Sequence, residues 1–273
     1  MVAAVRSVGA SLTLAGEGAR FDYVVMYDPD RVSPAQRVVM RQSANPNGAL
    51  AIAPAGTLMY VGGQGLRNSL DQYLGMLGGE AEYVWEDIYD PGQEVGLDFE
   101  RDVLSWADGE YALALIEDPA GLMGDEDVPL AFVVMLQASD RRAAERTMQS
   151  IISSLEQEAG VRVTDETISG QIFHVVGDPY QDVTSGYGFV NDFLVIGSSR
   201  QALSAAAEGR HFSLANDTAF KQATSQLPSR NGGYTYVHLK RGIDAVYRQM
   251  SRRDQEEFDE EVRPYLAPLR AVA

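Results

Sequence analysis

The feature that most constrains the fold is the placement of strand pairs between amphipathic helices. Residues 161–168 and 171–176 form a predicted hairpin around Ser169-Gly170, and residues 186–190 and 193–197 form another around Asn191-Asp192. A clear helical pattern over residues 140–158 precedes both pairs. Hairpins produce antiparallel pairing, whereas strict strand–helix alternation produces a parallel sheet. The sequence therefore predicts an α+β fold, with a mainly antiparallel sheet of hairpins and packed amphipathic helices.

The same two patterns assign the rest of the chain. Short apolar or alternating runs predict strands, and apolar residues three and four apart predict helices. Besides the two hairpins, strands are expected at residues 11–14, 20–27, 57–61, 110–116, 130–137 and 233–239. Helices are expected at residues 34–41, 66–77, 98–106, 140–158, 199–208, 218–226 and 243–262.

The two ends of the chain resemble each other. Residues 269–273 (LRAVA) are similar to residues 5–9 (VRSVG), which lead directly into the first predicted hairpin. We interpret this as one period of a longer tandem array. Residues 1–48 would then be a hairpin and short helix that close a preceding repeat and pack on the rest. Residues 49–273 would be the main α+β repeat unit, whose sheet the first hairpin would complete.

Negative charge is concentrated in one segment. The chain has 39 acidic and 22 basic residues, a net charge of −17, and residues 80–127 contain sixteen of the acidic residues with Arg101 as the one basic residue. An acidic chain repels phosphate backbones, so we expect no nucleic-acid partner. We interpret the segment as a solvated face that maintains solubility, or as a docking surface for a basic face of a protein partner.

A third interpretation of this segment is a divalent-cation site, with Ca²⁺ as the candidate ion. Calcium binds several oxygen ligands, mostly from carboxylates and carbonyl groups. The candidate ligands are Asp118, Asp125, Glu126 and Asp127, which follow the predicted strand at residues 110–116. The sequence lacks the EF-hand pattern, so this hypothesis depends on the clustering of acidic residues.

Signatures of catalysis are missing from the sequence. The absence of cysteine excludes disulfides, thiolate metal sites and cysteine nucleophiles. His174, His211 and His238 are too far apart in sequence for a metal-binding pair such as HExxH, and no GxSxG motif accompanies them. The run from Gly62 to Gly65 lacks the third glycine of a dinucleotide loop and is interpreted as a tight strand-to-helix connection. We therefore expect no catalytic residue and no cofactor other than Ca²⁺.

The sequence also contains no membrane-spanning segment. A spanning helix needs about 20 mainly apolar residues, and no run in this chain approaches that length. The first residues, MVAAVRSVG, have an arginine inside the would-be apolar region and are untypical of a signal peptide. The expectation is a cytoplasmic chain, or an excerpt whose targeting segment lies elsewhere.

Four segments in a fixed order resemble a known bacterial family, the domain of unknown function family 3352. They are residues 54–61 (PAGTLMYV), 96–106 (GLDFERDVLSW), 193–198 (FLVIGS) and 213–220 (SLANDTAF). Gly56 and Ser105 stand where the family usually has aspartate and proline. The resemblance implies a cell-envelope protein, often with an N-terminal membrane anchor in the full-length protein. It implies no activity and supplies no catalytic residues.

These observations favour a non-enzymatic extracytoplasmic module with a structural or protein-interaction role. One alternative is a carrier of an apolar small ligand or lipid, because a curved sheet covered by helices can enclose a cavity. A carboxylate-dependent hydrolase is a lesser alternative, since acidic pairs are plentiful in the chain.

Overall fold

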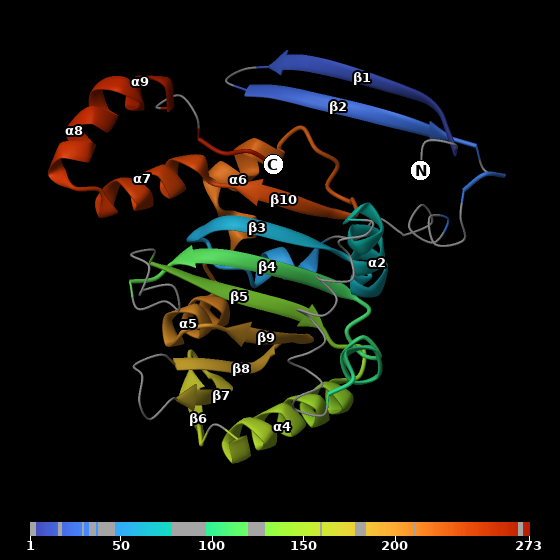
Figure 1. Cartoon of the computed structure of the whole chain (residues 1–273), viewed down its shortest axis with the longest axis vertical. Helices are drawn as coiled ribbons and strands as arrows, with labels where there is room; N and C mark the ends of the chain where they lie inside the picture. Colours follow the sequence, from blue (N-terminus) through green and yellow to red (C-terminus); the bar gives the residue numbers. More distant parts are fainter. Residues whose placement is uncertain are drawn as a thin grey trace.

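A single antiparallel sheet dominates the computed structural model of the chain (Figure 1). Its eight strands lie in the order β10-β3-β4-β5-β9-β8-β7-β6, and every neighbouring pair is antiparallel. The fold is therefore α+β with a mainly antiparallel sheet, as the sequence predicts. The structure describes residues 4–15, 18–28, 30–32, 37, 47–77, 97–119, 129–158, 160–177, 184–209, 211–266 and 270–273.

The strands agree with the predicted runs to within a few residues. Their bounds are β3 Thr57–Gln64, β4 Glu110–Glu117, β5 Leu130–Gln137, β6 Arg162–Ile168, β7 Gln171–Gly177, β8 Thr184–Val190, β9 Phe193–Gly197 and β10 Gly233–Val237. The β6–β7 and β8–β9 turns need a left-handed backbone, which Gly170 adopts with φ 78° and Asn191 with φ 57°.

Helices cover both faces of the sheet. Their bounds are α2 Leu66–Leu77, α4 Arg141–Glu158, α5 Arg200–Glu208, α6 Thr218–Thr224, α7 Leu239–Gln249, α8 Arg252–Glu261 and α9 Arg263–Leu266, with short turns η2 Gly48–Ala51, η4 Phe99–Val103 and η6 Leu214–Asn216. Alternation along β9 shows how the faces are used: Val195 packs with Leu203 of α5, whereas Leu194 packs with Met148 of α4.

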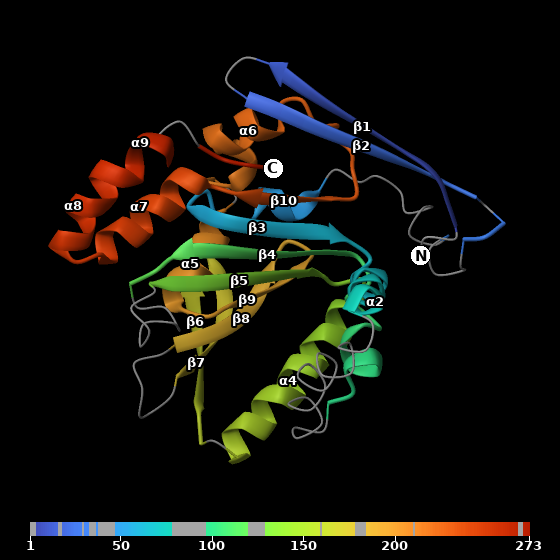
Figure 2. The ribbon, with the colours of Figure 1, turned by 45° about the horizontal axis from the view of Figure 1, so that its top comes forward.

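The first two strands form a separate sheet. β1 (Val5–Ala15) pairs with β2 (Gly18–Tyr27), and this hairpin lies on the β10 side of the main sheet in both views (Figures 1 and 2). The expectation that it completes the main sheet of its own chain is wrong, because the two sheets are separate. One physical reason is that Val272 already bridges Val237 on the outer edge of β10.

Three predicted boundaries require correction. The helix expected at residues 243–262 is two helices, because Met250 has an extended backbone and Ser251 caps α8. β10 ends at Val237, since the His238 side chain accepts a hydrogen bond from the Arg241 N–H and caps α7. The run from Gly62 to Gln64 belongs to β3 and is not a connecting loop.

The helix expected at residues 34–41 lies outside the described residues, apart from Arg37. The division of the chain at residue 48 remains a prediction.

Candidate protein-binding surface

The β1–β2 hairpin has one apolar face that is open to solvent. Its register places Leu12 opposite Phe21 and Val8 opposite Val25, so these side chains share one face. Leu12 is 65% exposed and Phe21 is 66% exposed, with Tyr23 at 70%. Soluble domains rarely leave so many large apolar side chains together in water, and such patches mark interaction sites. We call the side chains of Val8, Ala10, Leu12, Leu14, Ala19, Phe21, Tyr23 and Val25 the hairpin apolar face.

The opposite face of the hairpin is more polar. Arg20 donates to Asp22 through two nitrogens at 2.8 and 2.6 Å, and Ser11 lies opposite Asp22. Val24 and Met26 are exposed on this face as well. Arg20 also donates to the carbonyl oxygen of Gln226, which ties the hairpin to the segment after α6. The hairpin is thus amphipathic, with its charged pair turned away from the hairpin apolar face.

A second apolar surface lies beside β10. A pocket of about 290 Å³ opens between this edge strand and two helices, and it is lined by Val237, Leu239, Gly242, Ile243, Val246 and Phe258. Val246 of α7 lines this pocket and is 59% exposed. The hairpin and α7 both lie on the β10 side of the main sheet (Figure 2).

A more polar cleft of about 440 Å³ lies where α7 meets β3 and β4. Two arginines line it, and both are bound by their own chain. Arg248 donates to both carboxylate oxygens of Glu117 at 2.5 and 2.6 Å. Arg241 donates to Asp217 at 2.7 Å and to the carbonyl oxygen of Ala55 at 2.6 Å. Through these contacts, the two arginines join α7 to the sheet and to the start of α6.

The groups around Arg241 have shifted pKa values. Burial would raise the pKa of Asp217, but hydrogen bonds from the Phe220 N–H and from Arg241 outweigh it, and the pKa is lowered. Burial, and then the charge of Arg241, lowers the pKa of His238. The lowered pKa of Asp217 favours the carboxylate form, which its ion pair with Arg241 requires. The lowered pKa of His238 favours the neutral imidazole, which can accept the Arg241 N–H as the cap of α7.

The four candidate calcium ligands are only partly described. Asp118 is 1% exposed and accepts a hydrogen bond from the Ser199 hydroxyl, which itself accepts from the Ala202 N–H at 3.0 Å and caps α5. Asp125, Glu126 and Asp127 lie outside the described residues. Calcium binding thus remains a prediction, and the described contact of Asp118 is structural.

Other carboxylates of the acidic segment also have partners within the chain. Glu110 accepts from the N–H groups of Gly48 and Ala49, both at 2.7 Å, and so holds the start of η2. Glu117 binds Arg248, and Glu100 lies 3.5 Å from Arg67. Among residues 97–119, the acidic side chains mainly fix the fold. The proposed docking of a basic partner on residues 80–127 stays a prediction, since residues 78–96 and 120–128 lie outside the described residues.

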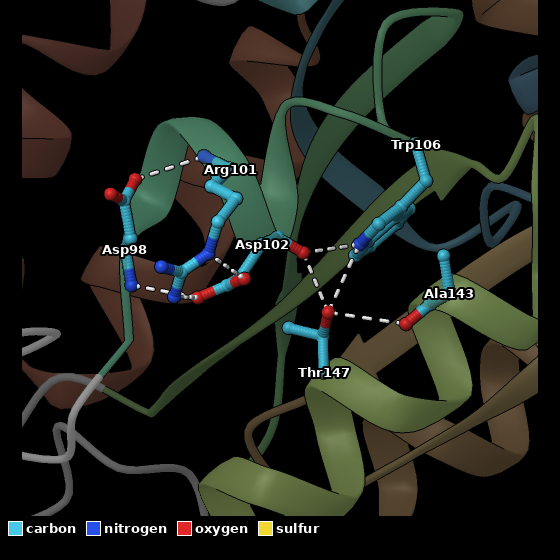
Figure 3. Close-up of polar contacts among 6 residues, drawn as sticks. All are labelled: Asp98, Arg101, Asp102, Trp106, Ala143 and Thr147. Carbon is cyan, nitrogen blue, oxygen red and sulfur yellow. Dashed lines mark hydrogen bonds and ion pairs between the residues drawn. The ribbon is translucent and has the colours of Figure 1, made fainter.

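A family-resembling motif anchors α4, as Figure 3 shows. Asp98 accepts from the Arg101 N–H at 2.9 Å and caps the π-helical turn η4. The Trp106 indole N–H then donates to the Asp102 carbonyl at 2.5 Å and to the Thr147 hydroxyl of α4 at 3.2 Å. Trp106 is 1% exposed. The contacts among these residues are structural, and the predicted short helix at residues 98–106 is this turn.

The histidines lie apart from one another along the described chain. His174 on β7 lies 2.6 Å from Asp165 on β6, and His238 caps α7. His211 lies in the turn after α5. Within the described residues, no group of three or more His, Asp or Glu side chains is placed to hold a metal ion. None of the described helices is long and apolar enough to cross a membrane.

On the face of the sheet that α5 covers, the described side chains form a packed core. Tyr60, Phe173 and Leu203 are almost completely buried in the cluster that packs α5 on the sheet. A carrier would need a cavity at this position. The cavities described above lie instead at the surface, beside α7.

Fold and surface together define the class of this protein: an α+β domain built on one antiparallel sheet, with an amphipathic hairpin appended to it. The chain belongs to the DUF3352 family of proteins of unknown function, whose family model matches residues 3–273. Searches of curated proteins and of solved structures return no match.

Sequence reasoning located the hairpin but missed the exposure of its apolar face. The signal was present, because apolar residues recur at every second position from Val8 to Leu14 and again from Phe21 to Val25. Alternation shows that one face is apolar, yet it does not show whether helices of the same chain cover that face. Only the arrangement in space revealed that these side chains are exposed.

Proposed function

We propose that this protein is a non-enzymatic protein-interaction module that binds its partner through the hairpin apolar face. The observation that carries this proposal is the exposure of Leu12, Phe21 and Tyr23 on one face of a hairpin outside the main sheet. An isolated two-stranded hairpin is marginally stable in water, and apolar faces of this kind gain stability when they are covered. A protein partner would supply that cover.

The family and the similarity of residues 5–9 to residues 269–273 support a location and a repeat organisation for the module. The resemblance of this family to envelope proteins supports an extracytoplasmic location, anchored in the full-length protein. The similarity of residues 5–9 and 269–273 supports a tandem repeat, with residues 1–48 closing a preceding unit and residues 49–273 forming the main unit. A tandem arrangement would place an apolar hairpin beside each successive sheet.

Site-specific photocrosslinking in bacteria that produce the protein tests the proposed function. A photoreactive amino acid replaces Tyr23 on the hairpin apolar face, and the matched control replaces Thr13 on the opposite face. The proposal predicts adducts of defined protein mass from the Tyr23 position and at most a tenth of that yield from the Thr13 position. Equal yields, or no protein adduct from either position, would refute it.

A further inference from the structure

We propose that His238 is a pH-sensitive switch at the start of α7, and that its protonation uncaps this helix and loosens it on the sheet at mildly acidic pH. Such a switch is independent of the hairpin apolar face and of the proposed function. It needs a cap that only a neutral imidazole can make and surroundings that oppose a further positive charge. It also needs a helix that few other contacts hold, and the described residues provide all three.

The cap depends on the protonation state of one ring nitrogen. His238 lies at the N-terminus of α7, where its Nδ1 accepts a hydrogen bond from the Arg241 N–H at 3.2 Å. A nitrogen that accepts carries no proton, so the neutral ring has its hydrogen on Nε2. In the protonated ring both nitrogens are donors, and the Arg241 N–H then loses its acceptor. Protonation of this ring therefore removes the cap of α7.

The ring that forms the cap lies inside the fold. His238 is 7% exposed, whereas His174 is partly exposed and His211 is exposed. The backbone N–H of His238 donates to the Leu58 carbonyl of β3 at 2.7 Å. Its ring packs edge-on against Tyr236 of β10, with the ring centroids 6.3 Å apart. Of the three histidines in the chain, His238 is thus the one whose positive charge would have to be accommodated away from water.

The charged groups that face His238 oppose a further positive charge. Lys240 and Arg241 face it from α7 itself, and Asp217 faces it from the start of α6. The Asp217 carboxylate is already bound to Arg241 at 2.7 Å. Burial lowers the pKa of His238 first, and the charge of Arg241 lowers it further.

Two more groups surround the ring on neighbouring strands. Tyr236 stays uncharged at acidic and neutral pH, because burial raises its pKa to about 12. The C-terminal segment carries another cation, Arg270, whose carbonyl oxygen accepts from the Lys240 N–H at 3.1 Å. Neither group offers a negative charge to a protonated His238, so the folded environment favours the neutral ring that the cap requires.

Few apolar contacts hold α7 on the sheet. Ala245 is the one buried residue of this helix, and Val246 is 59% exposed. The other contacts that attach it are polar, through Arg241 in the first turn and Arg248 in the last turn. Segments with few buried apolar groups open locally at low free energy, so the loss of a cap has a large effect on α7.

Loosening of α7 would change both cavities of the described surface. Its residues form part of the apolar pocket of about 290 Å³ and part of the polar cleft of about 440 Å³. Ile243 and Val246 line the first cavity, and Arg241 and Arg248 line the second. The switch would thus make the shape of this surface depend on the pH of the surroundings.

The lowered pKa of His238 determines the direction of the pH dependence. Because the folded chain favours the neutral ring, the contribution of the cap to stability is complete above the unfolded-state pKa of about 6.5. It is lost as the pH falls from that value through the lower folded-state pKa. Asp217 remains a carboxylate in this range, since its own pKa is lowered from about 4. A change in α7 near pH 6 is therefore assigned to His238.

Hydrogen exchange of the whole chain at pH 7 and pH 5, followed by mass spectrometry, tests the switch. Rates are compared as protection factors, which remove the direct effect of pH on exchange. Protection of the α7 amides should fall about fivefold at pH 5, the ratio that corresponds to the loss of a helix cap. Amides of β4 and β9 should keep their protection, because both strands are paired on each side.

His238→Asn separates capping from protonation. The Oδ1 of asparagine takes the place of the imidazole Nδ1, accepts from the Arg241 N–H and does not titrate. This variant should protect α7 equally at pH 7 and pH 5. The matched control is His174→Asn, which removes the histidine that contacts Asp165 on β6 and should show the wild-type fall. Equal protection of α7 at the two pH values in the wild type, or the same fall in His238→Asn, would overturn the switch.

An NMR titration of the wild type gives a test that needs no variant. The chemical shift of the Arg241 amide should change with the same midpoint as the ring signals of His238, at a pH below about 6.5. An Arg241 amide that does not respond while the His238 ring titrates would show that protonation leaves the cap intact, and the proposal would fail.

Discussion

The hairpin and the main sheet are both built from antiparallel strands that carry apolar side chains, and these side chains are exposed in one and buried in the other. In the main sheet, Phe173 and Val195 are fully buried at 0% exposure, because α5 covers that face. In the hairpin, Leu12 and Phe21 remain about two-thirds exposed. Alternation determines which face is apolar, and the elements packed on that face determine whether it is buried.

Because of this difference, substitutions in the two regions should change different properties of the protein. Apolar groups that the chain buries itself contribute to the free energy of unfolding. Apolar groups left in water contribute little to it and are available to a partner. Substitutions in the sheet should therefore change stability with no dependence on protein concentration. Substitutions on the hairpin apolar face should change association and leave stability nearly unaltered.

The largest effect is expected at Trp106. Trp106→Ala removes a buried ring and the hydrogen bonds of its indole N–H to the Asp102 carbonyl and the Thr147 hydroxyl. Aromatic-to-alanine changes in cores cost about 3–5 kcal/mol. Urea unfolding, followed by circular dichroism, should show a loss of that size. A loss under 1 kcal/mol would mean that this side of the sheet is as loosely packed as the hairpin.

An intermediate effect is expected at Ser199. Ser199→Ala removes the cap of α5 and the hydroxyl that Asp118 accepts from. Loss of a serine cap costs about 1–2 kcal/mol. The matched control is Ser204→Ala on the same helix, where the hydroxyl is 3.4 Å from the exposed Glu208, and it should change stability by less than about 0.5 kcal/mol. Thermal unfolding of the two variants measures the difference, and equal shifts would contradict the structural role of Ser199.

A smaller and pH-dependent effect is expected at Asp217. Its folded-state pKa is lowered, so its contribution to stability is complete above the unfolded-state pKa of about 4 and is lost as the pH falls through the folded-state pKa. Asp217→Asn should retain the helix cap, lose about 1 kcal/mol at pH 7, and show a weaker loss of stability on acidification. Urea midpoints measured from pH 7 down to pH 3 test this. Parallel curves for the variant and the wild type would contradict it.

The smallest effect on stability is expected on the hairpin apolar face. Phe21→Ser should change the free energy of unfolding of the main sheet by less than about 0.5 kcal/mol, because Phe21 is 66% exposed. The same substitution should lower the yield of the photocrosslink from the Tyr23 position several-fold. Thr13→Ser on the opposite face is the control. A destabilisation above 2 kcal/mol would show that the hairpin belongs to the core of its own chain.

Much of this fold is predictable because its signals are local. The β6–β7 and β8–β9 hairpins follow from two-residue turns, where Gly170 and Asn191 adopt the left-handed backbone. The break between α7 and α8 was missed, although Ser251 is a typical cap, because the helical pattern continues on both sides of it. Contacts between distant residues, such as Arg241 with Asp217, depend on tertiary packing and carry no local signal. The hairpin apolar face is an intermediate case. Its alternation is visible in the sequence, but its exposure depends on tertiary packing.

Hydrogen exchange of the isolated protein tests the central claim most directly. If the hairpin apolar face is left open by its own chain, amides of β1 and β2 should exchange much faster than those of the main sheet. Amides of β4 and β9, which have a paired strand on each side, should be among the slowest. Protection of β1 equal to that of β4 and β9 would contradict the account, because the hairpin would then be packed in the core of its own chain.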